Sequence, residues 1–297
     1  MKAIEFENVR RAYAGGNEVL RGVSFSMEPG EVVGLLGRNG AGKTTLIHIA
    51  MGLLEAHGGR ARVLGLDPRK DAVEMKRRVG FVSEEQILPP RLRVSEVLGF
   101  HRRLFPTWNL NFERQVRERF TLPDNARIST LSKGQARQVA LLCAVAHRPE
   151  VLLLDEPAGG LDPAARREFL ETSIQLLNEA GSAILFSSHY MSDVERMAGR
   201  ILMLEDGRIL IDQALDTLRE DYTLALLDGE DATLAGRLEA LEPCVCVRRR
   251  NGGTRAVFHV GPDDCRALLA AHEAGSQARC VSITLEEMFV EIAGGRK

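Results

Sequence analysis

Apolar and polar residues alternate near the start of the chain, which is the period-two pattern of half-buried strands. Ile4, Phe6 and Val9 carry this pattern first, and residues 23–27 repeat it. Residues 31–36 are then mostly apolar, as expected for a strand that is buried on both faces. The opening of the chain therefore predicts half-buried strands followed by one fully buried strand.

The rest of the chain alternates between short apolar runs and helical spacing. Three apolar runs predict further buried strands, at residues 79–82, 151–154 and 183–186. Residues 163–180 predict a helix, and residues from about 92 to 120 predict a charged helical insert. Beyond about residue 218 the pattern changes to short strands and helices. We therefore expect a first domain of residues 1–217 and a smaller second domain of residues 218–297.

Composition and charge limit the possible partners. The chain has 297 residues, of which 44% are hydrophobic and 27% charged, and its formal net charge is -2. A nucleic-acid surface needs clustered Lys and Arg, so we expect no nucleic-acid partner. A basic run, Arg248-Arg249-Arg250, leads into Asn251-Gly252-Gly253. We interpret it as a solvated hairpin end in preference to a binding patch.

Cysteines and apolar stretches bear on the location of the protein. Five scattered cysteines are too few for a disulfide framework, so a reducing, cytoplasmic location fits best. Cys244 and Cys246 would share one face of a strand, which is more typical of core packing than of a metal site. The longest apolar stretch, residues 139–146, is far shorter than the roughly 18 residues of a membrane span. With no leader pattern evident, we expect any membrane association to be through a partner.

A glycine-rich loop follows the buried strand and precedes a helical pattern. It matches G-x-x-x-x-G-K-[ST] in full and consists of Gly37, Arg38, Asn39, Gly40, Ala41, Gly42, Lys43 and Thr44, with Thr45 next to it. Backbone N–H groups in such a loop form an anion nest at a helix N-terminus. Lys43 can bridge the β- and γ-phosphates of ATP, and the Thr44 hydroxyl can hold Mg²⁺. A chance glycine turn is the alternative.

Two carboxylates follow the apolar run at residues 151–154. Asp155 and Glu156 would lie at the carboxyl edge of a buried sheet, where ligands bind in such folds. Asp155 is then suited to Mg²⁺, and Glu156 to act as the general base for the water that attacks the γ-phosphate. A solvated strand end is the alternative for this pair.

The segment Leu131-Ser132-Lys133-Gly134-Gln135 resembles the L-S-G-G-Q signature of ABC (ATP-binding cassette) ATPases. Ser132 and Gln135 also form a capping-box pattern at a helix start, which is the structural alternative. The resemblance covers about residues 1–217. It implies an α/β fold: a phosphate-loop NTPase core with an antiparallel β subdomain and a helical insert at about residues 84–135, followed by a small C-terminal α/β domain.

The resemblance also implies roles for residues outside the phosphate loop. The signature of one subunit would close on the ATP of another, so that Ser132, Gly134 and Gln135 contact that nucleotide. Asp162, in a segment similar to the D-loop, would lie at the dimer interface. His189 occupies the position of the switch histidine and joins Lys43 and Glu156 as a catalytic residue, although a lone histidine is more often structural. Tyr13 occupies the position of the aromatic residue that stacks on adenine.

Two departures from the family pattern stand out. Lys133 replaces the first signature glycine, and Glu84 occupies the position of a glutamine that binds Mg²⁺. We take Glu84 as a metal ligand together with Thr44 and Asp155, with Glu85 and Gln86 as alternatives. Glu84, Lys133 and the segment at residues 105–108 are similar to bacterial ABC ATPases encoded beside GntR-type regulators.

We therefore expect an ATP-hydrolysing subunit that powers transport through separate transmembrane permease subunits. The resemblance implies ATP and Mg²⁺ as cofactors, an ATP-dependent homodimer or heterodimer, and a peripheral location on the inner face of the cell membrane. A group of apolar residues lines either the permease groove or the core of the insert: Leu88, Leu92, Val94, Leu98 and Trp108. The alternative function is a soluble non-transport ABC ATPase of the cluster-assembly type. The transported substrate and the direction of transport stay open.

Overall fold

The computed structural model describes residues 1–13, 15–85, 88–229, 232–250, 252–271 and 278–293. The chain divides into two compact units, residues 1–212 and 213–297. The sequence pattern predicted a boundary after residue 217. Within the described residues, no helix has both the length and the apolar character that crossing a bilayer requires.

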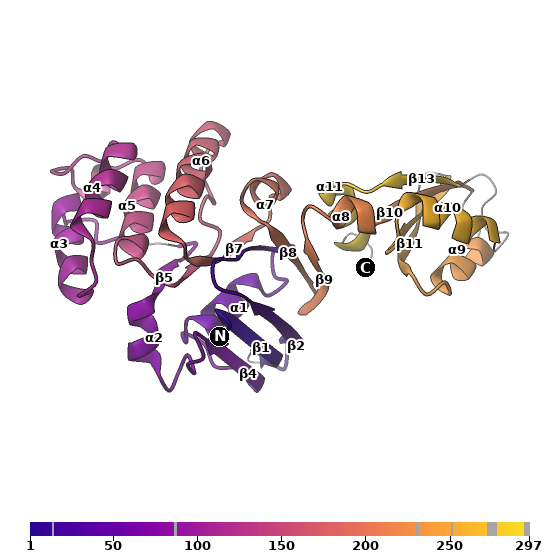
Figure 1. Cartoon of the computed structure of the whole chain (residues 1–297), viewed down its shortest axis with the longest axis horizontal. Helices are drawn as coiled ribbons and strands as arrows, with labels where there is room; N and C mark the ends of the chain where they lie inside the picture. The colour runs from indigo at the N-terminus through magenta and orange to yellow at the C-terminus, as the bar shows by residue number, and fades with distance from the viewer. Residues whose placement is uncertain (14, 86–87, 230–231, 251, 272–277, 294–297) are drawn as a thin grey trace. The chain divides into compact units, whose positions relative to one another are not determined.

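An antiparallel sheet of three strands opens the first unit (Figure 1). Its order is β2 (Glu18–Met27), β1 (Ile4–Ala12) and β4 (Gly58–Val63). The apolar positions of the alternating pattern are buried, and the rings of Phe6 and Phe25 stack with their centroids 5.0 Å apart. The half-buried strands expected from the sequence are confirmed.

A second sheet of six strands forms the centre of this unit. Its order is β5 (Val79–Val82), β6 (Val151–Leu154), β7 (Ala183–Ser188), β3 (Val32–Leu36), β8 (Arg200–Glu205) and β9 (Arg208–Ala214). The pairs from β5 to β8 are parallel. Parallel strands end at the same edge of a sheet, so the residues that follow β3, β5, β6 and β7 meet there.

Helices cover both faces of the six-stranded sheet. Helix α1 (Lys43–Ala50) shares one hydrophobic core with both sheets. The other face is covered by α5 (Lys133–Val145) and α7 (Met191–Met197). A glycine is required at Gly80 on β5, because a Cβ atom there would lie 2.2 Å from the backbone oxygen of Ala144 on α5. This close contact brings the predicted signature helix against the sheet.

The insert expected from the sequence is helical. It contains α3 (Val94–Leu104), α4 (Leu110–Arg119), the short helix η1 (Ile128–Thr130) and the start of α5. Helix α2 (Ala72–Arg78) precedes the insert in the chain, and α6 (Pro163–Ala180) lies beside α5 (Figure 1). Val94 and Leu98 are fully buried, so they belong to the core of the insert and not to a docking groove. Leu88 is also buried, whereas Leu92 is 37% exposed.

The second unit has the βαββαβ order of the ferredoxin-like split βαβ fold. Its elements are α8 (Leu218–Asp221), β10 (Thr223–Asp228), α9 (Ala232–Glu239), β11 (Cys244–Arg250), β12 (Gly253–Phe258), α10 (Pro262–Ala271), β13 (Arg279–Ser282) and α11 (Leu285–Ala293). The antiparallel sheet has the order β11-β12-β10-β13. Helices α9 and α10 pack on one face of the sheet, and α11 covers β11 and β12.

A bulge in β11 overturns one expectation from the sequence. Cys244 pairs with Phe258 and Cys246 with the adjacent Val257, so the two cysteines do not share a face. Cys244 joins the core beneath α9 and α10, whereas the Cys246 thiol lies 3.5 Å from the backbone oxygen of Glu291 on α11. An extra residue in a strand reverses the alternation of its side chains, and this bulge is not visible in the sequence pattern.

The basic run at residues 248–250 ends β11, which pairs with β12 as the expected hairpin. Asn251 lies outside the described residues. Arg249 and Arg250 are exposed, but the side chain of Arg248 is only 9% exposed and lies 3.6 Å from the carboxylate of Glu291. The description of the run as solvated is therefore wrong for Arg248.

Candidate nucleotide-binding site

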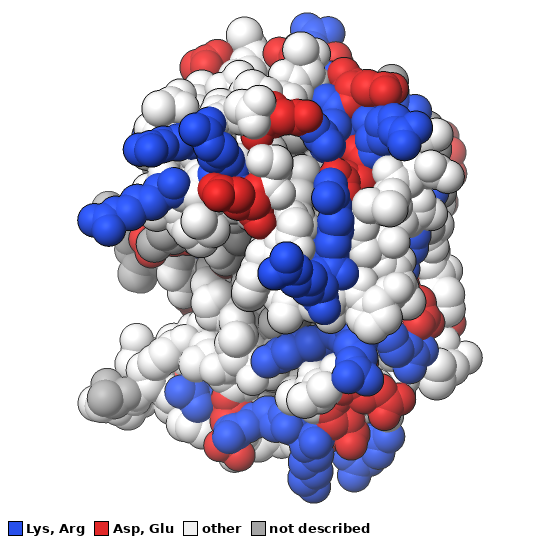
Figure 2. Space-filling view, turned by 90° about the vertical axis from the view of Figure 1, so that its left-hand side faces the viewer, with Lys and Arg blue, Asp and Glu red and all other residues white. Residues whose placement is uncertain are grey.

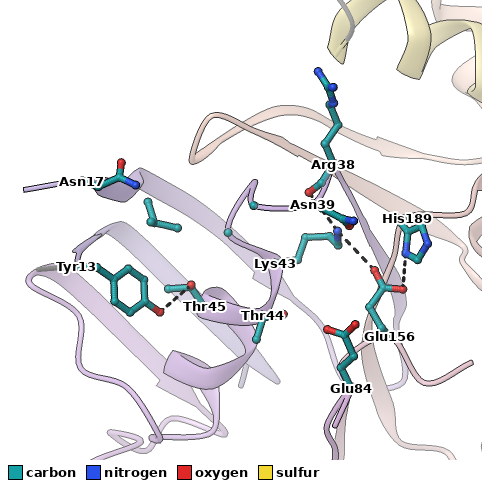
Figure 3. A pocket seen from close by; sticks show the side chains of 13 residues that line it. Tyr13, Asn17, Arg38, Asn39, Lys43, Thr44, Thr45, Glu84, Glu156 and His189 are labelled. Atoms are coloured by element: carbon teal, nitrogen blue, oxygen red, sulfur yellow. Dashed lines mark hydrogen bonds and ion pairs between the residues drawn. The ribbon is translucent and has the colours of Figure 1, made fainter. Parts of the chain in front are cut away.

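A pocket of about 480 Å³ opens at the carboxyl edge of the six-stranded sheet (Figure 3). Its lining residues are Tyr13, Asn17, Val19, Arg38, Asn39, Gly40, Gly42, Lys43, Thr44, Thr45, Glu84, Glu156 and His189. Most of the nucleotide and catalytic residues expected from the sequence thus meet in one place. Asn17 and Val19 were not expected, because nothing in the sequence pattern distinguishes them from other strand residues.

The phosphate loop connects β3 to α1 at the centre of this pocket. Gly42 caps α1 with a φ of 110°, a left-handed backbone conformation that residues other than glycine rarely adopt. The Lys43 side chain is almost fully buried, and its ammonium donates to the backbone oxygen of Gly37 at 2.7 Å and of Arg38 at 3.3 Å. The loop thus curls around its own lysine at a helix N-terminus, which is a favourable place for phosphate.

The two carboxylates that follow β6 have different surroundings. Asp155 is 1% exposed, and its Oδ1 accepts a hydrogen bond from the Ser187 hydroxyl at 2.7 Å. Its Oδ2 has no hydrogen-bond partner among the described residues. Glu156 is 6% exposed and has a φ of 46°, a strained conformation of the kind that gathers at functional sites. The backbone N–H of Glu156 donates to the same Ser187 hydroxyl at 2.9 Å.

The Glu156 carboxylate lies between two cationic or titratable groups. Its Oε1 is 3.5 Å from the Lys43 ammonium, and its Oε2 is 2.9 Å from Nδ1 of His189 (Figure 3). His189 follows β7, so three parallel strands each contribute one member of this group. The sequence predicted all three side chains, but not that they contact one another.

Tyr13 lies at the opposite end of the pocket (Figure 3). Its hydroxyl is 3.1 Å from the hydroxyl of Thr45, and the Arg11 guanidinium lies 5.2 Å from the centre of its ring. The tyrosine is 42% exposed, so the ring has surface available for stacking.

Glu84 follows β5 and faces the pocket below Glu156 (Figure 3). Its position is set by Arg137 of α5, which donates to the backbone oxygens of Ser83, at 2.8 Å, and of Glu84. Burial lowers the pKa of the Arg137 guanidinium. Sequence reasoning missed Arg137; its place two residues after Gln135 of the signature was the only available signal. Gln86 lies outside the described residues.

The signature residues lie apart from this pocket. Ser132 and Gln135 form the expected capping box at the start of α5, which confirms the helix N-cap. Asp162 caps α6 by accepting from the N–H groups of Ala164 and Ala165. Four more predicted residues are not among those that line the pocket: Gly37, Ala41, Gly134 and Asp155. A separate hollow of about 390 Å³ lies beside the signature and is lined by Glu84, Glu85, Lys133, Ala136, Arg137, Gly159 and Gly160.

Comparison with known proteins identifies the family. Residues 20–159 match the family of ABC transporters. The chain is 32% identical to the ABC transporter ATP-binding protein YtrB of Bacillus subtilis (strain 168), over 99% of both chains. The chain belongs to the ABC transporter ATP-binding proteins. It is therefore an ATP-hydrolysing subunit of an ABC transporter, and the non-transport alternative is not favoured.

Other relatives agree with this assignment of the ATP-binding subunit. The chain is 35% identical to the Nod factor export ATP-binding protein I of Rhizobium etli, over 99% of this chain and 94% of that relative. A solved ATP-binding subunit of an ABC transporter has a TM-score of 0.66 and 28% identity, and the match covers 73% of this chain and 92% of that structure.

Proposed function

We propose that Glu156 is the general base of this ATPase, with Lys43 and His189 on either side of it. The observation that carries the proposal is the contact of the Glu156 carboxylate with both groups, at 3.5 Å and 2.9 Å. A carboxylate in this place can accept a proton from the attacking water. The Lys43 ammonium stabilises negative charge on the β- and γ-phosphates, and His189 donates to the γ-phosphate. Tyr13 stacks on the adenine base.

Magnesium fits the carboxylates and hydroxyl at the edge of the sheet. Thr44, Glu84 and Asp155 offer the oxygen ligands that Mg²⁺ prefers, and Asp155 Oδ2 is buried without a partner in the described part of the chain. The described residues contain no group of three or more His, Cys, Asp or Glu side chains suited to a metal, so phosphate oxygens and water would complete the shell. The ion, when bound, neutralises charge on the triphosphate.

A second ATPase subunit completes the site in this proposal. Ser132, Gly134 and Gln135 at the start of α5 bind the γ-phosphate of the ATP that the other subunit holds, and Asp162 lies at the interface between them. The exposed N-terminus of α5 supports this role, because its N–H groups favour an anion. The second subunit is another copy of this chain or a related ATPase.

Separate transmembrane subunits dock on the helical insert, and the protein is thereby held at the cytoplasmic face of the membrane. The insert exposes four large apolar side chains, Leu92 at 37%, Phe100 at 57%, Leu104 at 52% and Leu110 at 58%. Lys and Arg side chains are numerous on the face that carries α2, α3 and α4 (Figure 2). Exposed apolar side chains on a face rich in Lys and Arg support contact with an amphipathic, acidic segment of a permease.

Two finer assignments accompany this proposal. We assign the subunit to an exporter, because relatives that are named as export proteins align over nearly the whole chain, including the second unit. The segment at residues 284–289, which resembles the tail of export-type cassettes, opens α11 and supports the same assignment. Kinship with ATPases encoded beside GntR-type regulators stays a prediction.

The experiment is to compare ATP hydrolysis by the wild-type protein and by Glu156→Gln. The variant keeps the shape of the side chain and lacks its basicity, so the rate should fall by about 10² to 10⁴-fold while ATP binding is retained. Glu74→Gln is a control, since this exposed carboxylate on α2 lines neither the nucleotide pocket nor the hollow beside the signature. Hydrolysis by Glu156→Gln at the wild-type rate would show that another group is the base.

A further inference from the structure

Tyr190 directly follows the catalytic histidine and contacts its ring. The ring centroids of His189 and Tyr190 are 3.9 Å apart, with an angle of 41° between their planes. Tyr190 is 42% exposed, so it does not serve to fill the hydrophobic core. An exposed aromatic ring in contact with a catalytic side chain calls for an explanation other than packing.

Arg166 of α6 holds Tyr190 from a different part of the chain. Its guanidinium carbon lies 3.3 Å from the centre of the Tyr190 ring. The same guanidinium donates to both carboxylate oxygens of Asp193, from Nε at 3.1 Å and from Nη2 at 2.8 Å. The side chains of Arg166 and Asp193 are only 13% and 6% exposed, so this pair is well shielded from water. A buried planar ion pair of this kind has little freedom to move.

The backbone on both sides of His189 is held by the same group. The Ser188 hydroxyl donates to Oδ2 of Asp193 at 3.0 Å, and it accepts from the backbone N–H of Tyr190 at 3.0 Å. Arg166 lies in the first turn of α6, where its backbone N–H donates to the backbone oxygen of Asp162 at 2.9 Å. A continuous set of contacts therefore runs from the D-loop to His189.

We propose that Tyr190, held by Arg166, is a positioning residue for His189. This inference rests on the proposed action of His189 on the γ-phosphate. The Tyr190 ring restricts rotation of the imidazole, so that Nδ1 stays toward Glu156 and Nε2 is directed to the phosphate. Residues that orient a catalytic group in this way commonly change the rate by tenfold or more.

The test compares Tyr190→Leu with Tyr190→Phe. The leucine removes the aromatic ring, and the phenylalanine keeps the ring and removes only the hydroxyl. We expect Tyr190→Leu to lower kcat about tenfold with KM for ATP changed less than about twofold, and Tyr190→Phe to retain the wild-type kcat. Arg166→Lys keeps a positive charge beside Asp193 but loses the planar guanidinium that stacks on the Tyr190 ring, so it should also lower kcat. In the double variant, Arg166→Lys should not lower kcat below the value of Tyr190→Leu alone, because both substitutions act through the Tyr190 ring.

A spectroscopic measurement separates positioning from the proposed function. The imidazole resonances of His189 are assigned by comparison with His189→Gln in protein with labelled histidines, and the Tyr190 ring should shift them through its ring current. The shift should persist in Tyr190→Phe and vanish in Tyr190→Leu. Unchanged resonances and an unchanged kcat in Tyr190→Leu would overturn the inference. If His189→Gln hydrolyses ATP at the wild-type rate while the resonances still respond to Tyr190, the proposed role of His189 fails and the contact stands as structural.

Discussion

His147 is a buried histidine at the end of α5, and its burial makes stability depend on pH. Its ring is stacked on Phe105 with a centroid distance of 4.1 Å, and the residue is 2% exposed. Neither ring nitrogen has a hydrogen-bond partner among the described side chains and backbone. Burial lowers the pKa of His147 from 6.5 to about 4; the backbone of Val79 opposes this shift, and the neighbouring His101 contributes a smaller part of it. The folded protein therefore keeps this ring neutral where the unfolded chain would protonate it.

The sign and size of the effect follow from these two pKa values. Above the unfolded pKa of 6.5, the His147 ring is neutral in both the folded and the unfolded chain, and its burial does not reduce the free energy of unfolding. Between 6.5 and about 4 only the unfolded chain binds the proton, so the free energy of unfolding falls as the pH falls. At about 1.36 kcal/mol per pKa unit, the loss is roughly 2 kcal/mol at about pH 5 and about 3 kcal/mol below pH 4.

The assay is urea unfolding of the wild-type protein and of His147→Phe at about pH 8 and about pH 5. Trp108 is the only tryptophan in the chain and lies in the helical insert, where its Nε1 donates to Glu113, so its fluorescence reports this region. The stability of His147→Phe relative to wild type should rise by roughly 2 kcal/mol between the two pH values. His147→Leu should show the same pH-dependent change, with an added loss of stacking on Phe105 at both pH values.

The pH-dependent difference isolates His147, because every other titrating group is common to the proteins compared. The opposite result would be a difference in unfolding free energy between wild type and His147→Phe that is the same at both pH values. It would mean that His147 titrates alike in the folded and unfolded chains, in spite of its burial.

Two further predictions concern the metal and the second unit. Glu84→Gln should retain ATPase activity and lower the Mg²⁺ concentration for half-maximal rate, because it removes one negative charge beside Asp155 and Glu156. Identical Mg²⁺ titration curves for the two proteins would show that Glu84 does not reach the metal. Truncation after Asp212 should leave ATP binding intact and change dimerisation or coupling, since all residues of the nucleotide pocket lie in residues 1–212. Loss of ATP binding in a truncated protein that still folds would contradict this prediction.

Most of the nucleotide site was predictable because its residues lie in short, contiguous motifs. The phosphate loop, the Asp155-Glu156 pair and the Ser132 capping pattern each depend on spacings of one to four residues, and each follows or precedes a strongly patterned element. Local patterns of this kind fix the order of strand, loop and helix. The parallel sheet then brings His189 and Glu84 to the same edge.

The contacts that the sequence did not predict all join distant segments. Arg137 reaches the backbone of Ser83 and Glu84 from α5, and Arg166 reaches Tyr190 from α6. Arginine is common on helix surfaces, so no local signal marks these two as buried partners.

Two other outcomes have separate physical causes. Val94 and Leu98 were possible groove residues because helical spacing shows that one face is apolar but not what covers it. In the structure this face packs within the insert. The Cys244–Cys246 face was mispredicted because a single inserted residue at a bulge reverses the side-chain alternation.

We propose that the signature of one subunit completes the ATP site of another, and complementation between two inactive variants is a direct test of this arrangement. Lys43→Ala disables the phosphate loop, and Ser132→Arg disables the signature, so each variant alone should hydrolyse ATP very slowly. A mixed dimer has one site built from the intact phosphate loop of one chain and the intact signature of the other. Random pairing of equal amounts makes half of the dimers mixed, each with one working site of two, so the mixture should recover about a quarter of the wild-type rate. If mixed dimers form from folded chains and hydrolysis does not recover, the two motifs do not act across the interface.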